Sequence, residues 1–451
     1  MHNIIGVFRE GRSKRGEQRV AITPNVAKQI VDWGYKLIVQ SRIHPESKEV
    51  KRAFRDSQYQ KAGAIIQEDL SKADLIFGLK EIFPARILPN KAYYFFSHTH
   101  KGQIKNRPML KKLVDLKTTV IDYELITDKD NGRYVTAFTY NAGYAGMVDS
   151  LWTLGKRLTY FGIKNKFELI PQAVEGQDLL SVKNIISKVA INIKRDGTTE
   201  KIPPVIVCFL GQGKTAFGAR EIFNLLPYEE INTSDLEYVY KNGSRKKLYV
   251  LQIGAEDSYR LKKNIKLNIE EYAKLKTRGK RHFYIEHPDF FESNMDKILP
   301  YVTVLMNCVI WNSKYPRSIS NRIMYNVWKE SKTLKVIGDI TCDPNGSIEF
   351  SKETWIDNPV YVYNPLTEKS NDGFEGDGVA VMAVTNLPCE FSADASIQFS
   401  EDISPLLKGI LKANYKGLIS ESGLPEEIKR ATILWKGKFT QKYAYMKKYL
   451  E

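Results

Sequence analysis

The sequence predicts an α/β protein with two Rossmann-like domains, mostly parallel sheets and an interdomain cleft. Strand and helix patterns alternate from the first residues onward, which is typical of a parallel sheet covered by helices on both faces. A continuous apolar run at residues 205–210 indicates a strand buried on both faces, and a glycine-rich turn follows it directly. At 451 residues the chain is long enough for two or three domains.

The first domain is expected to end near residue 140. Residues 24–33 predict a helix, because Thr23 can act as its N-cap, Pro24 suits its first turn and Gly34 can end it. Around this helix we expect strands at residues 3–9, 36–40, 74–80, 92–98 and 118–123.

The second domain is expected to open with a long helix at residues 141–158, whose first residues are small and allow close packing. A further helix is predicted at 176–195, and strands are predicted at 205–210, 248–253, 302–309, 335–340 and 378–384. Residues 255–298 are rich in Lys, Tyr and Glu with weak periodicity, and we interpret them as an insertion or lid-like segment. The remaining C-terminal residues are expected to return to the first domain.

Composition favours a globular protein that binds small molecules. The net charge is +16, but the basic residues are spread among acids, and we expect no nucleic-acid partner. The four cysteines are far apart and form no CxxC pair, so reduced core thiols are expected rather than a metal site. No window approaches 18 apolar residues and the N-terminus lacks a signal-peptide pattern, so we expect a cytoplasmic protein without a membrane segment. The oligomeric state stays open.

The glycine-rich turn at residues 211–218, GQGKTAFG, is the clearest local motif. Gly211 and Gly213, on either side of Gln212, would make a tight turn whose backbone N–H groups approach a pyrophosphate. Gly218 would let the following helix pack closely on the strand. The spacing is GxGxxxxG rather than GxGxxG, and residues 214–217 are bulky, but the strand before and the helix after it predict a dinucleotide site. The alternative is a structural glycine turn.

The choice between NAD and NADP is not settled by the sequence. An acid roughly twenty positions after the turn would bind the ribose of NAD, and Glu230 or Asp235 could take this place. Lys241 and Arg245 lie downstream and could instead meet the 2′-phosphate of NADP. The sequence favours NADP, with NAD possible.

Polar residues follow several strands of the first domain. The carboxyl ends of parallel strands meet at one crevice, so these side chains should converge in one cleft. They are Arg9, Glu10, Glu17, Arg19, Lys80, Glu81, His98, His100, Lys101, Asp122 and Glu124. Taken singly, each has a structural reading: a Lys after a strand is usually a surface Lys, and Glu17 with Arg19 could be an ion pair at a helix start. Their shared position at strand ends favours a functional site.

These residues resemble the alanine dehydrogenase and transhydrogenase superfamily, and within it the saccharopine dehydrogenase branch. Residues 17–24, EQRVAITP, are similar to the N-terminal signature of the superfamily. The branch is indicated by Lys80-Glu81 and by residues 96–103, 122–124, 132–138 and 142–146. Within it the chain resembles, over nearly its whole length, the lysine–ketoglutarate reductase half of a bifunctional enzyme. The second dehydrogenase activity of that enzyme is expected to be absent.

The resemblance implies an oxidoreductase that joins L-lysine and 2-oxoglutarate to saccharopine, or the reverse, by hydride transfer between a nicotinamide and an imine. It implies that Lys80 and His98 are the acid–base groups. Carbinolamine formation, dehydration and imine protonation each move a proton, so the reaction needs such groups. His100 leaves the assignment ambiguous, and His98 is preferred because the Lys-x-Gln that follows fixes the register.

The resemblance also implies binding residues. Arg19 would bind a substrate carboxylate in bidentate geometry, and Arg133 is a candidate for a second carboxylate. Glu81 and Glu124 would tune the local charge or hold substrate amino groups, and Glu17 belongs to the same set. The cofactor residues would be Gly211, Gln212, Gly213, Gly218 and Asp339, with no metal. Residues 1–140 plus about 385–451 would form the substrate and catalytic domain, and 141–384 the dinucleotide-binding domain.

Two alternatives remain. One is a sibling enzyme, an alanine dehydrogenase or another opine-type imine reductase. The other is a basic nucleotide-binding module with a regulatory role. Lys80, His98 and Arg19 argue against the module, because binding alone does not need that set.

Overall fold

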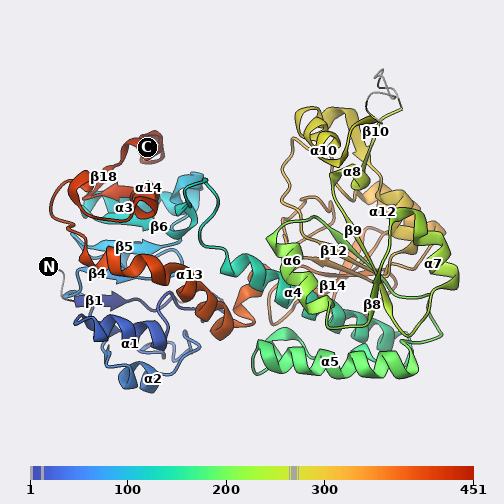
Figure 1. Cartoon of the computed structure of the whole chain (residues 1–451), viewed down its shortest axis with the longest axis horizontal. Coiled ribbons are helices and arrows are strands. Elements are labelled where there is room, and N and C mark those ends of the chain that lie inside the picture. Colours follow the sequence, from blue (N-terminus) through green and yellow to red (C-terminus); the bar gives the residue numbers. More distant parts are fainter. Residues whose placement is uncertain (1–3, 12–14, 264, 266–271, 273) are drawn as a thin grey trace. The chain divides into compact units, whose positions relative to one another are not determined.

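The computed structural model describes residues 4–11, 15–263, 265, 272 and 274–451, and it contains two compact units (Figure 1). The first unit combines residues 1–138 with 392–451, and the second comprises residues 139–391. Each unit is built on an eight-stranded, mostly parallel sheet with helices on both faces. The α/β class predicted from the sequence is therefore confirmed.

The first sheet has the strand order β18-β17-β6-β5-β4-β1-β2-β3. Strands β1 to β6 are parallel, whereas β17 and β18 extend the sheet in antiparallel fashion. The bounds are β1 Ile4–Val7, β2 Lys36–Val39, β3 Ile65–Ile66, β4 Leu75–Phe77, β5 Ala92–Phe95, β6 Thr119–Asp122, β17 Thr432–Trp435 and β18 Lys438–Phe439. The parallel register brings the carboxyl ends of β1, β4, β5 and β6 to one edge.

Helices cover both faces of the first sheet, which explains why its strands are apolar without alternation. In β5, Tyr94 belongs to one core and its neighbours Tyr93 and Phe95 to the other. The first face is covered by α1 Pro24–Asp32, α2 Asp56–Lys61, α13 Ser392–Lys412 and α14 Glu426–Ala431. The second face is covered by α3 Arg107–Asp115 and the 3₁₀ segment η12 Gln441–Tyr449.

The second sheet has the order β15-β14-β16-β13-β12-β7-β9-β8. Strands β8, β9, β7, β12, β13 and β16 are parallel, and β14 and β15 complete the sheet in antiparallel fashion. The bounds are β7 Ile206–Leu210, β8 Tyr228–Glu230, β9 Leu248–Ile253, β12 Val304–Asn307, β13 Val336–Asp339, β14 Val360–Asn364, β15 Lys369–Asp372 and β16 Val379–Met382.

Two helical layers enclose the second sheet (Figure 1). One core contains side chains of α4 Ala137–Tyr160, α5 Leu179–Asp196 and α6 Lys214–Phe223. The core on the other face contains side chains of α7 Leu236–Asn242, α11 Met295–Ile298 and α12 Asn321–Glu330. The strand β7 is fully buried between these layers, as the run of apolar residues predicts.

The segment interpreted as an insertion forms a small subdomain after β9. Its described residues include α8 Ala255–Ser258, β10 Tyr259–Leu261, α10 Thr277–Glu286 and β11 Phe291–Ser293, with β10 and β11 antiparallel. Tyr259, Tyr284 and Phe291 form its own aromatic core. Part of this segment, and so part of the expected lid, lies outside the described residues.

The strands are shorter than the sequence suggests. Apolar residues continue past the hydrogen-bonded ladder: β5 ends at Phe95 although the apolar and aromatic run extends to Phe96. Within the described part of the chain, no helix has the length and apolar character needed to cross a membrane.

Candidate active site and dinucleotide site

Asp122 organises the loop that carries the predicted histidine. This carboxylate ends β6 and is fully buried. Its Oδ2 accepts hydrogen bonds from the Ser97 N–H at 3.0 Å, the Ser97 hydroxyl at 2.6 Å and the His98 N–H at 3.1 Å. Its Oδ1 accepts from the Glu124 N–H at 2.9 Å. Burial alone would raise the pKa of Asp122, but hydrogen bonding with His100 and Ser97 outweighs it, so the pKa is lowered and the group is a carboxylate.

His98 lies between two glutamates. Its Nδ1 is 2.7 Å from Glu81 Oε1, and its Nε2 is 3.8 Å from Glu124 Oε2. Its backbone has φ of 51°, a left-handed conformation that a residue with a Cβ adopts only when its surroundings hold it there. The hydrogen bonds to Asp122 supply that support. The imidazole is therefore fixed in direction and has a carboxylate at each nitrogen, an arrangement that suits proton transfer.

Lys80 and His98 share one aromatic neighbour. The Lys80 Nζ lies 6.0 Å from the centroid of the Phe96 ring, and the His98 ring stacks on Phe96 with centroids 6.1 Å apart. The two residues predicted to act together thus lie near the same ring, Lys80 after β4 and His98 after β5. Beneath Lys80 lies Glu10, whose carboxylate accepts hydrogen bonds from the N–H groups of Leu79 and Lys80 at 2.8 and 3.1 Å. Burial and the neighbouring Glu17 raise the pKa of Glu10 to about 7.

Glu124 collects several cationic or donor groups. The Lys101 Nζ lies 2.8 Å from its Oε2, and the Arg133 guanidinium donates to its Oε1 at 3.2 Å. His98 and His100 both approach the same Oε2. Because Glu124 occupies the centre of this group, it links the predicted acid–base residue to the predicted carboxylate binder Arg133.

Glu17 and Arg19 form a buried pair. The Arg19 Nε and NH2 donate to the two oxygens of Glu17 at 2.8 and 2.6 Å, and the guanidinium lies 4.3 Å from the centroid of the Phe138 ring. Both side chains are almost completely buried. The bidentate geometry expected for a substrate carboxylate is therefore made with Glu17 in this structure.

Sequence reasoning undervalued three residues of this cluster. Glu10 is predicted only as a polar residue at a strand end, whereas Asp122 and Lys101 also belong to the segments that carry the resemblance. The structure makes Asp122 the main support of the loop and Glu10 a buried neighbour of Lys80. A signal was present, since a carboxylate that directly follows an apolar strand is the first group beyond a buried sheet edge. Arg9 is different, because its guanidinium forms a bidentate pair with Glu68 at 2.8 Å, although Arg9 lines the same small cavity as Glu10 and Arg19.

The glycine turn has the shape of an anion-binding loop. Gly211 has φ of 108°, which disfavours any other residue, and a Cβ there would lie 3.2 Å from the Cys308 carbonyl oxygen. A Cβ at Gly213, in contrast, would meet no atom within 4 Å, and Gly213 is the N-cap of the ten-residue helix α6. At Gly218 a Cβ would lie 2.3 Å from the Tyr140 carbonyl oxygen, so this glycine lets α6 pack on α4. The residues present therefore fit a bound pyrophosphate.

A cavity of about 400 Å³ adjoins the turn. Its lining includes Gly211, Gln212 and Gly213, together with Gly254 at the end of β9 and the rings of Tyr284 and Trp311. This size and the mixture of apolar walls with backbone N–H groups suit a nucleotide. The predicted residues Gly211, Gln212 and Gly213 thus meet in one place.

Asp339 has a different setting. It ends β13, but it is buried and accepts hydrogen bonds from Asn307 Nδ2 at 2.7 Å, Thr341 Oγ1 at 3.0 Å and the Cys342 N–H at 3.2 Å. Burial raises its pKa, an effect that these hydrogen bonds oppose. The Ser351 hydroxyl also donates to this carboxylate, and together these hydrogen bonds let Asp339 support the loop after β13.

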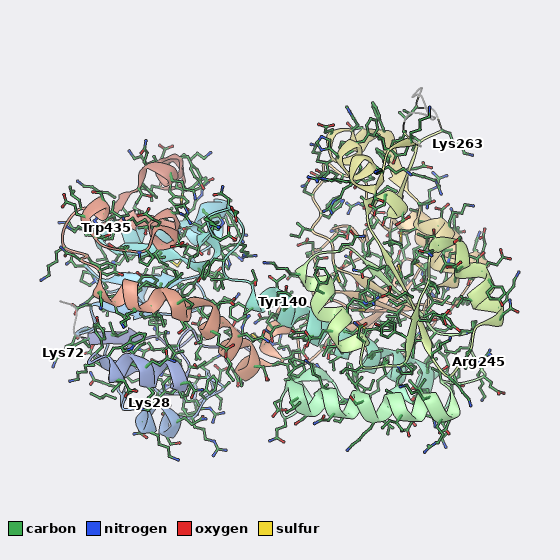
Figure 2. The ribbon with its side chains drawn as sticks, viewed as in Figure 1. Lys28, Lys72, Tyr140, Arg245, Lys263 and Trp435 are labelled. Atoms are coloured by element: carbon green, nitrogen blue, oxygen red, sulfur yellow. The ribbon has the colours of Figure 1, made fainter. Side chains whose placement is uncertain are left out.

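The basic residues that favoured NADP lie at the other edge of the second sheet. Arg245 precedes β9 and donates to the carbonyl oxygens of Thr199 and Ile202, whereas the glycine turn follows the carboxyl end of β7. Figure 2 shows Arg245 well away from Lys263, which follows β10. Lys241 pairs with Glu237 on its own helix at 2.5 Å.

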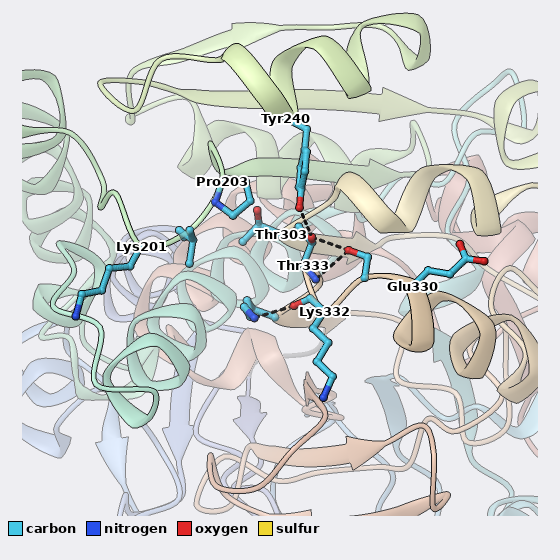
Figure 3. Close-up of a pocket in the computed structure, with 10 residues that line it drawn as sticks. Lys201, Pro203, Tyr240, Thr303, Glu330, Lys332 and Thr333 are labelled. Carbon is cyan, nitrogen blue, oxygen red and sulfur yellow. Dashed lines mark hydrogen bonds between the residues drawn. The ribbon is translucent and has the colours of Figure 1, made fainter.

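A second cavity, of about 310 Å³, lies at this other edge (Figure 3). Thr333 donates to the Tyr240 hydroxyl at 3.3 Å and hydrogen-bonds with Ser331 at 2.7 Å, so the hydroxyls satisfy one another. Lys201, Lys332 and Glu330 extend from it in three different directions. The charged ends do not converge on one point. Among the described residues there is also no group of His, Cys, Asp or Glu side chains suited to a metal ion.

Comparison with known proteins identifies the relatives of the chain. Residues 6–145 match the family described as alanine dehydrogenase/PNT, N-terminal domain. The whole-chain similarity is to two kinds of enzyme. The chain is 33% identical over 99% of its length to the alpha-aminoadipic semialdehyde synthase of Arabidopsis thaliana and 29% identical over its full length to that of Bos taurus. The chain is a homologue of these enzymes.

The chain spans 41% and 48% of these two relatives, so it corresponds to less than half of each. It is also 24% identical, over 89% of its length, to the saccharopine dehydrogenase [NAD(+), L-lysine-forming] of Emericella nidulans, of which it covers 91%. The resemblance expected from the sequence is confirmed.

Solved structures support the fold. An L-alanine dehydrogenase superposes with a TM-score of 0.62 at 16% identity, covering 99% of this chain and all of that one. The transhydrogenase of Sinorhizobium meliloti gives 0.54 at 14% identity, covering 97% of this chain and 98% of that one. These two comparisons concern the fold alone.

Proposed function

We propose that the chain is a nicotinamide-dependent oxidoreductase that interconverts L-lysine plus 2-oxoglutarate and saccharopine. The observation that carries the proposal is the fixed imidazole of His98, with Glu81 at one nitrogen and Glu124 at the other, beside Lys80. The name of one homologue, saccharopine dehydrogenase [NAD(+), L-lysine-forming], contains saccharopine and L-lysine, and 2-oxoglutarate comes from the resemblance described above.

The two units take different roles in this proposal. The first unit, residues 1–138 and 392–451, supplies the acid–base and substrate-binding side chains. The second unit supplies the dinucleotide site, with the pyrophosphate on the N–H groups of Gly211 to Gly213 and at the start of α6. When bound, the nicotinamide would donate hydride to the imine carbon or accept it in the reverse direction.

Proton transfers fall to Lys80 and His98. The lysine ε-amine adds to the keto carbon of 2-oxoglutarate, and the carbinolamine must lose water as its hydroxyl accepts a proton. His98, oriented by Glu81, can give that proton and later take one from the nitrogen. Lys80 lies next to the same ring of Phe96 and can serve the other half of each exchange.

Substrate carboxylates are proposed to bind to Arg133 and Arg19. Arg133 is half exposed and forms an ion pair with Glu124, so it can exchange this partner for a substrate carboxylate. Arg19 would have to share its guanidinium with Glu17. Glu81 and Glu124 keep the site negative enough to attract the ammonium groups of lysine.

For the cofactor we propose NAD. The strand next to β7 is β9, not β8, so the ribose position lies after Ile253 rather than near Glu230. The carboxylate of Glu256 lies there, and its oxygens are 2.5 and 2.6 Å from where a Cβ of Gly254 would be. A carboxylate at this place accepts hydrogen bonds from the ribose hydroxyls and repels a 2′-phosphate. The residues that favoured NADP are at the opposite edge.

A reducing, cytoplasmic location is proposed on the cysteines. All four are free thiols, and three of them are buried. Cell fractionation followed by detection of the protein tests this location.

The experiment that tests the function is a substrate panel with the purified protein. Lysine plus 2-oxoglutarate should drive NADH oxidation, whereas pyruvate plus ammonia should not. Lys80→Met combined with His98→Gln should keep the fold and NADH binding but lower kcat at least about 100-fold. His282→Gln, on the exposed face of α10, is the control and should leave kcat unchanged. Activity with pyruvate plus ammonia alone would instead identify an alanine dehydrogenase.

A further inference from the structure

His100 is a second histidine at the carboxylate that faces His98. It is the residue that left the assignment of the acid–base histidine ambiguous, and the proposed reaction gives it no role. Its Nε2 lies 3.6 Å from Glu124 Oε2, the same oxygen that lies 3.8 Å from His98 Nε2. The two imidazoles are therefore neighbours across a single carboxylate oxygen.

The other nitrogens of the two rings also face carboxylates. His100 Nδ1 lies 3.7 Å from Asp122 Oδ2, and His98 Nδ1 lies 2.7 Å from Glu81 Oε1. Carboxylates and imidazoles thus alternate in the order Asp122, His100, Glu124, His98, Glu81. The contact of His98 with Glu81 is within hydrogen-bond distance, whereas the other three contacts, at 3.6, 3.7 and 3.8 Å, are longer. A proton passes along these three only when the groups move closer together.

The row is only partly exposed to water. The side chains of His98, His100 and Glu124 are 19%, 17% and 21% exposed, and Asp122 is fully buried. Charges in such a setting interact more strongly than on an open surface. A proton bound to one histidine should therefore change the proton affinity of the other, which is the condition for coupled titration.

The charged groups described around His100 come from several elements of the first unit. The carboxylates come from the end of β6 and the turn after it, and Lys101 comes from the same loop as His100. Tyr445 of η12 donates to the His100 carbonyl oxygen at 3.4 Å. The titratable or charged groups around His100 are Asp122, Glu124, His98, Lys101, Arg133, Tyr443 and Tyr445. Glu81, which faces His98, adds a third carboxylate, and the cations are Lys101 and Arg133, so one shared proton would balance the charge.

We infer that His100 is a positioning residue that exchanges a proton with His98 through Glu124. When His98 takes a proton at Nε2, it can pass that proton to Glu124 Oε2. Glu124 passes it to His100 Nε2, whose Nδ1–H then faces Asp122. No electron is transferred and the proton count is unchanged. The role of His100 in turnover rests on the proposed function, whereas the proton coupling between His98 and His100 does not.

Nuclear magnetic resonance of the histidines tests the coupling without substrate. The chain has six histidines, so selective ¹³C labelling of the Cε1 atoms gives a spectrum that His98→Gln and His100→Gln can assign. Each of these variants should raise the titration midpoint of the remaining histidine by on the order of one pH unit, because a competing positive charge is lost. Glu124→Gln should lower both midpoints, and His282→Gln should move neither. Midpoints that stay within about 0.2 pH unit in all variants would overturn the inference.

Turnover then tests the role in the proposed reaction. His100→Gln should lower kcat about tenfold, move the acidic limb of the pH–rate profile and leave KM unchanged. A purely structural role would lower the unfolding midpoint or raise KM while kcat stays the same, and this result would contradict the inference. If the substrate panel is negative while the two histidines titrate as a coupled pair, the proposed function fails and the coupling stands.

Discussion

Replacing Asp122 by Asn should destabilise the first unit strongly. The carboxylate accepts three hydrogen bonds at Oδ2, from Ser97 and His98, and one at Oδ1 from Glu124. Asn keeps one acceptor oxygen, so its NH₂ must face an N–H donor on one side or the other. Losing charge-assisted hydrogen bonds at a buried site costs about 1.5–3 kcal/mol each, so we expect a loss on the order of 3 kcal/mol in the free energy of unfolding.

The loss should depend on pH in a defined direction. The pKa of Asp122 is lowered in the folded protein, so its stabilising effect is present above the ordinary pKa of an aspartate, about 4, and disappears as pH falls through the lowered value. The difference between the wild type and Asp122→Asn should therefore be full at pH 7 and shrink under acid conditions. The left-handed loop at His98 would lose its support, and kcat should fall as well.

Fluorine resonances of 5-fluorotryptophan separate the first unit from the second during urea unfolding. Trp33 and Trp435 belong to the first unit, among six tryptophans in the chain. Asp32→Asn is the matched control, because Asp32 makes only an exposed pair with Lys28 at 2.9 Å and should change stability by less than about 0.5 kcal/mol. A change of less than about 1 kcal/mol for Asp122→Asn at pH 7 would refute the reasoning.

Four further predictions concern single residues. Gly218→Ala should destabilise the second unit by about 1–3 kcal/mol in urea unfolding, because its Cβ would lie 2.3 Å from the backbone oxygen of Tyr140. The Cβ of Gly213→Ala would meet no atom within 4 Å, so this variant should keep wild-type stability. Its Kd for NADH, measured by calorimetry, should rise more than about tenfold, and an unchanged Kd would show that the turn does not bind the cofactor. Because the pKa of Glu10 is raised to about 7, the free energy of unfolding should fall by on the order of 3 kcal/mol as pH rises from about 4.5 to 7. Glu10→Gln should remove this fall, and an unchanged slope would contradict the prediction. Glu256→Ser should lower the preference for NADH over NADPH at least about tenfold in kcat/KM, and an unchanged ratio would move the ribose site elsewhere.

The sequence predicted the buried parallel strands of both sheets, because burial on two faces leaves continuous apolar runs. The strand β7, for example, could be placed from its composition alone. The sequence did not predict the short or antiparallel strands β3, β8, β14, β15, β17 and β18. Strand neighbours could not be predicted in the same way. The order in which β8 and β9 lie beside β7 depends on long-range pairing, and this order moved the expected ribose position from Glu230 to the loop that holds Glu256.

The sequence indicated which residue types lie at the strand ends of the candidate site, but not which side chains contact one another. Lys80 and His98 follow neighbouring strands, and the parallel register brings them together. The pairing of Arg19 with Glu17 and the local hydrogen bonds of Asp339 depend on side-chain directions that no spacing reveals. The same is true of His100, whose contact with the oxygen that faces His98 depends on the left-handed turn between β5 and η2 Thr99–Lys101.

The most direct measurement is the fate of the transferred hydride. NADH that carries deuterium at C4 is mixed with lysine and 2-oxoglutarate, and the product is analysed by mass spectrometry. Saccharopine with one deuteron on the former keto carbon is the predicted result with the wild type, and Lys80→Met with His98→Gln should form little of it. Saccharopine that lacks deuterium whichever of the two C4 positions carries the label, or deuterium that appears in alanine when pyruvate and ammonia are supplied, would contradict the proposed reaction.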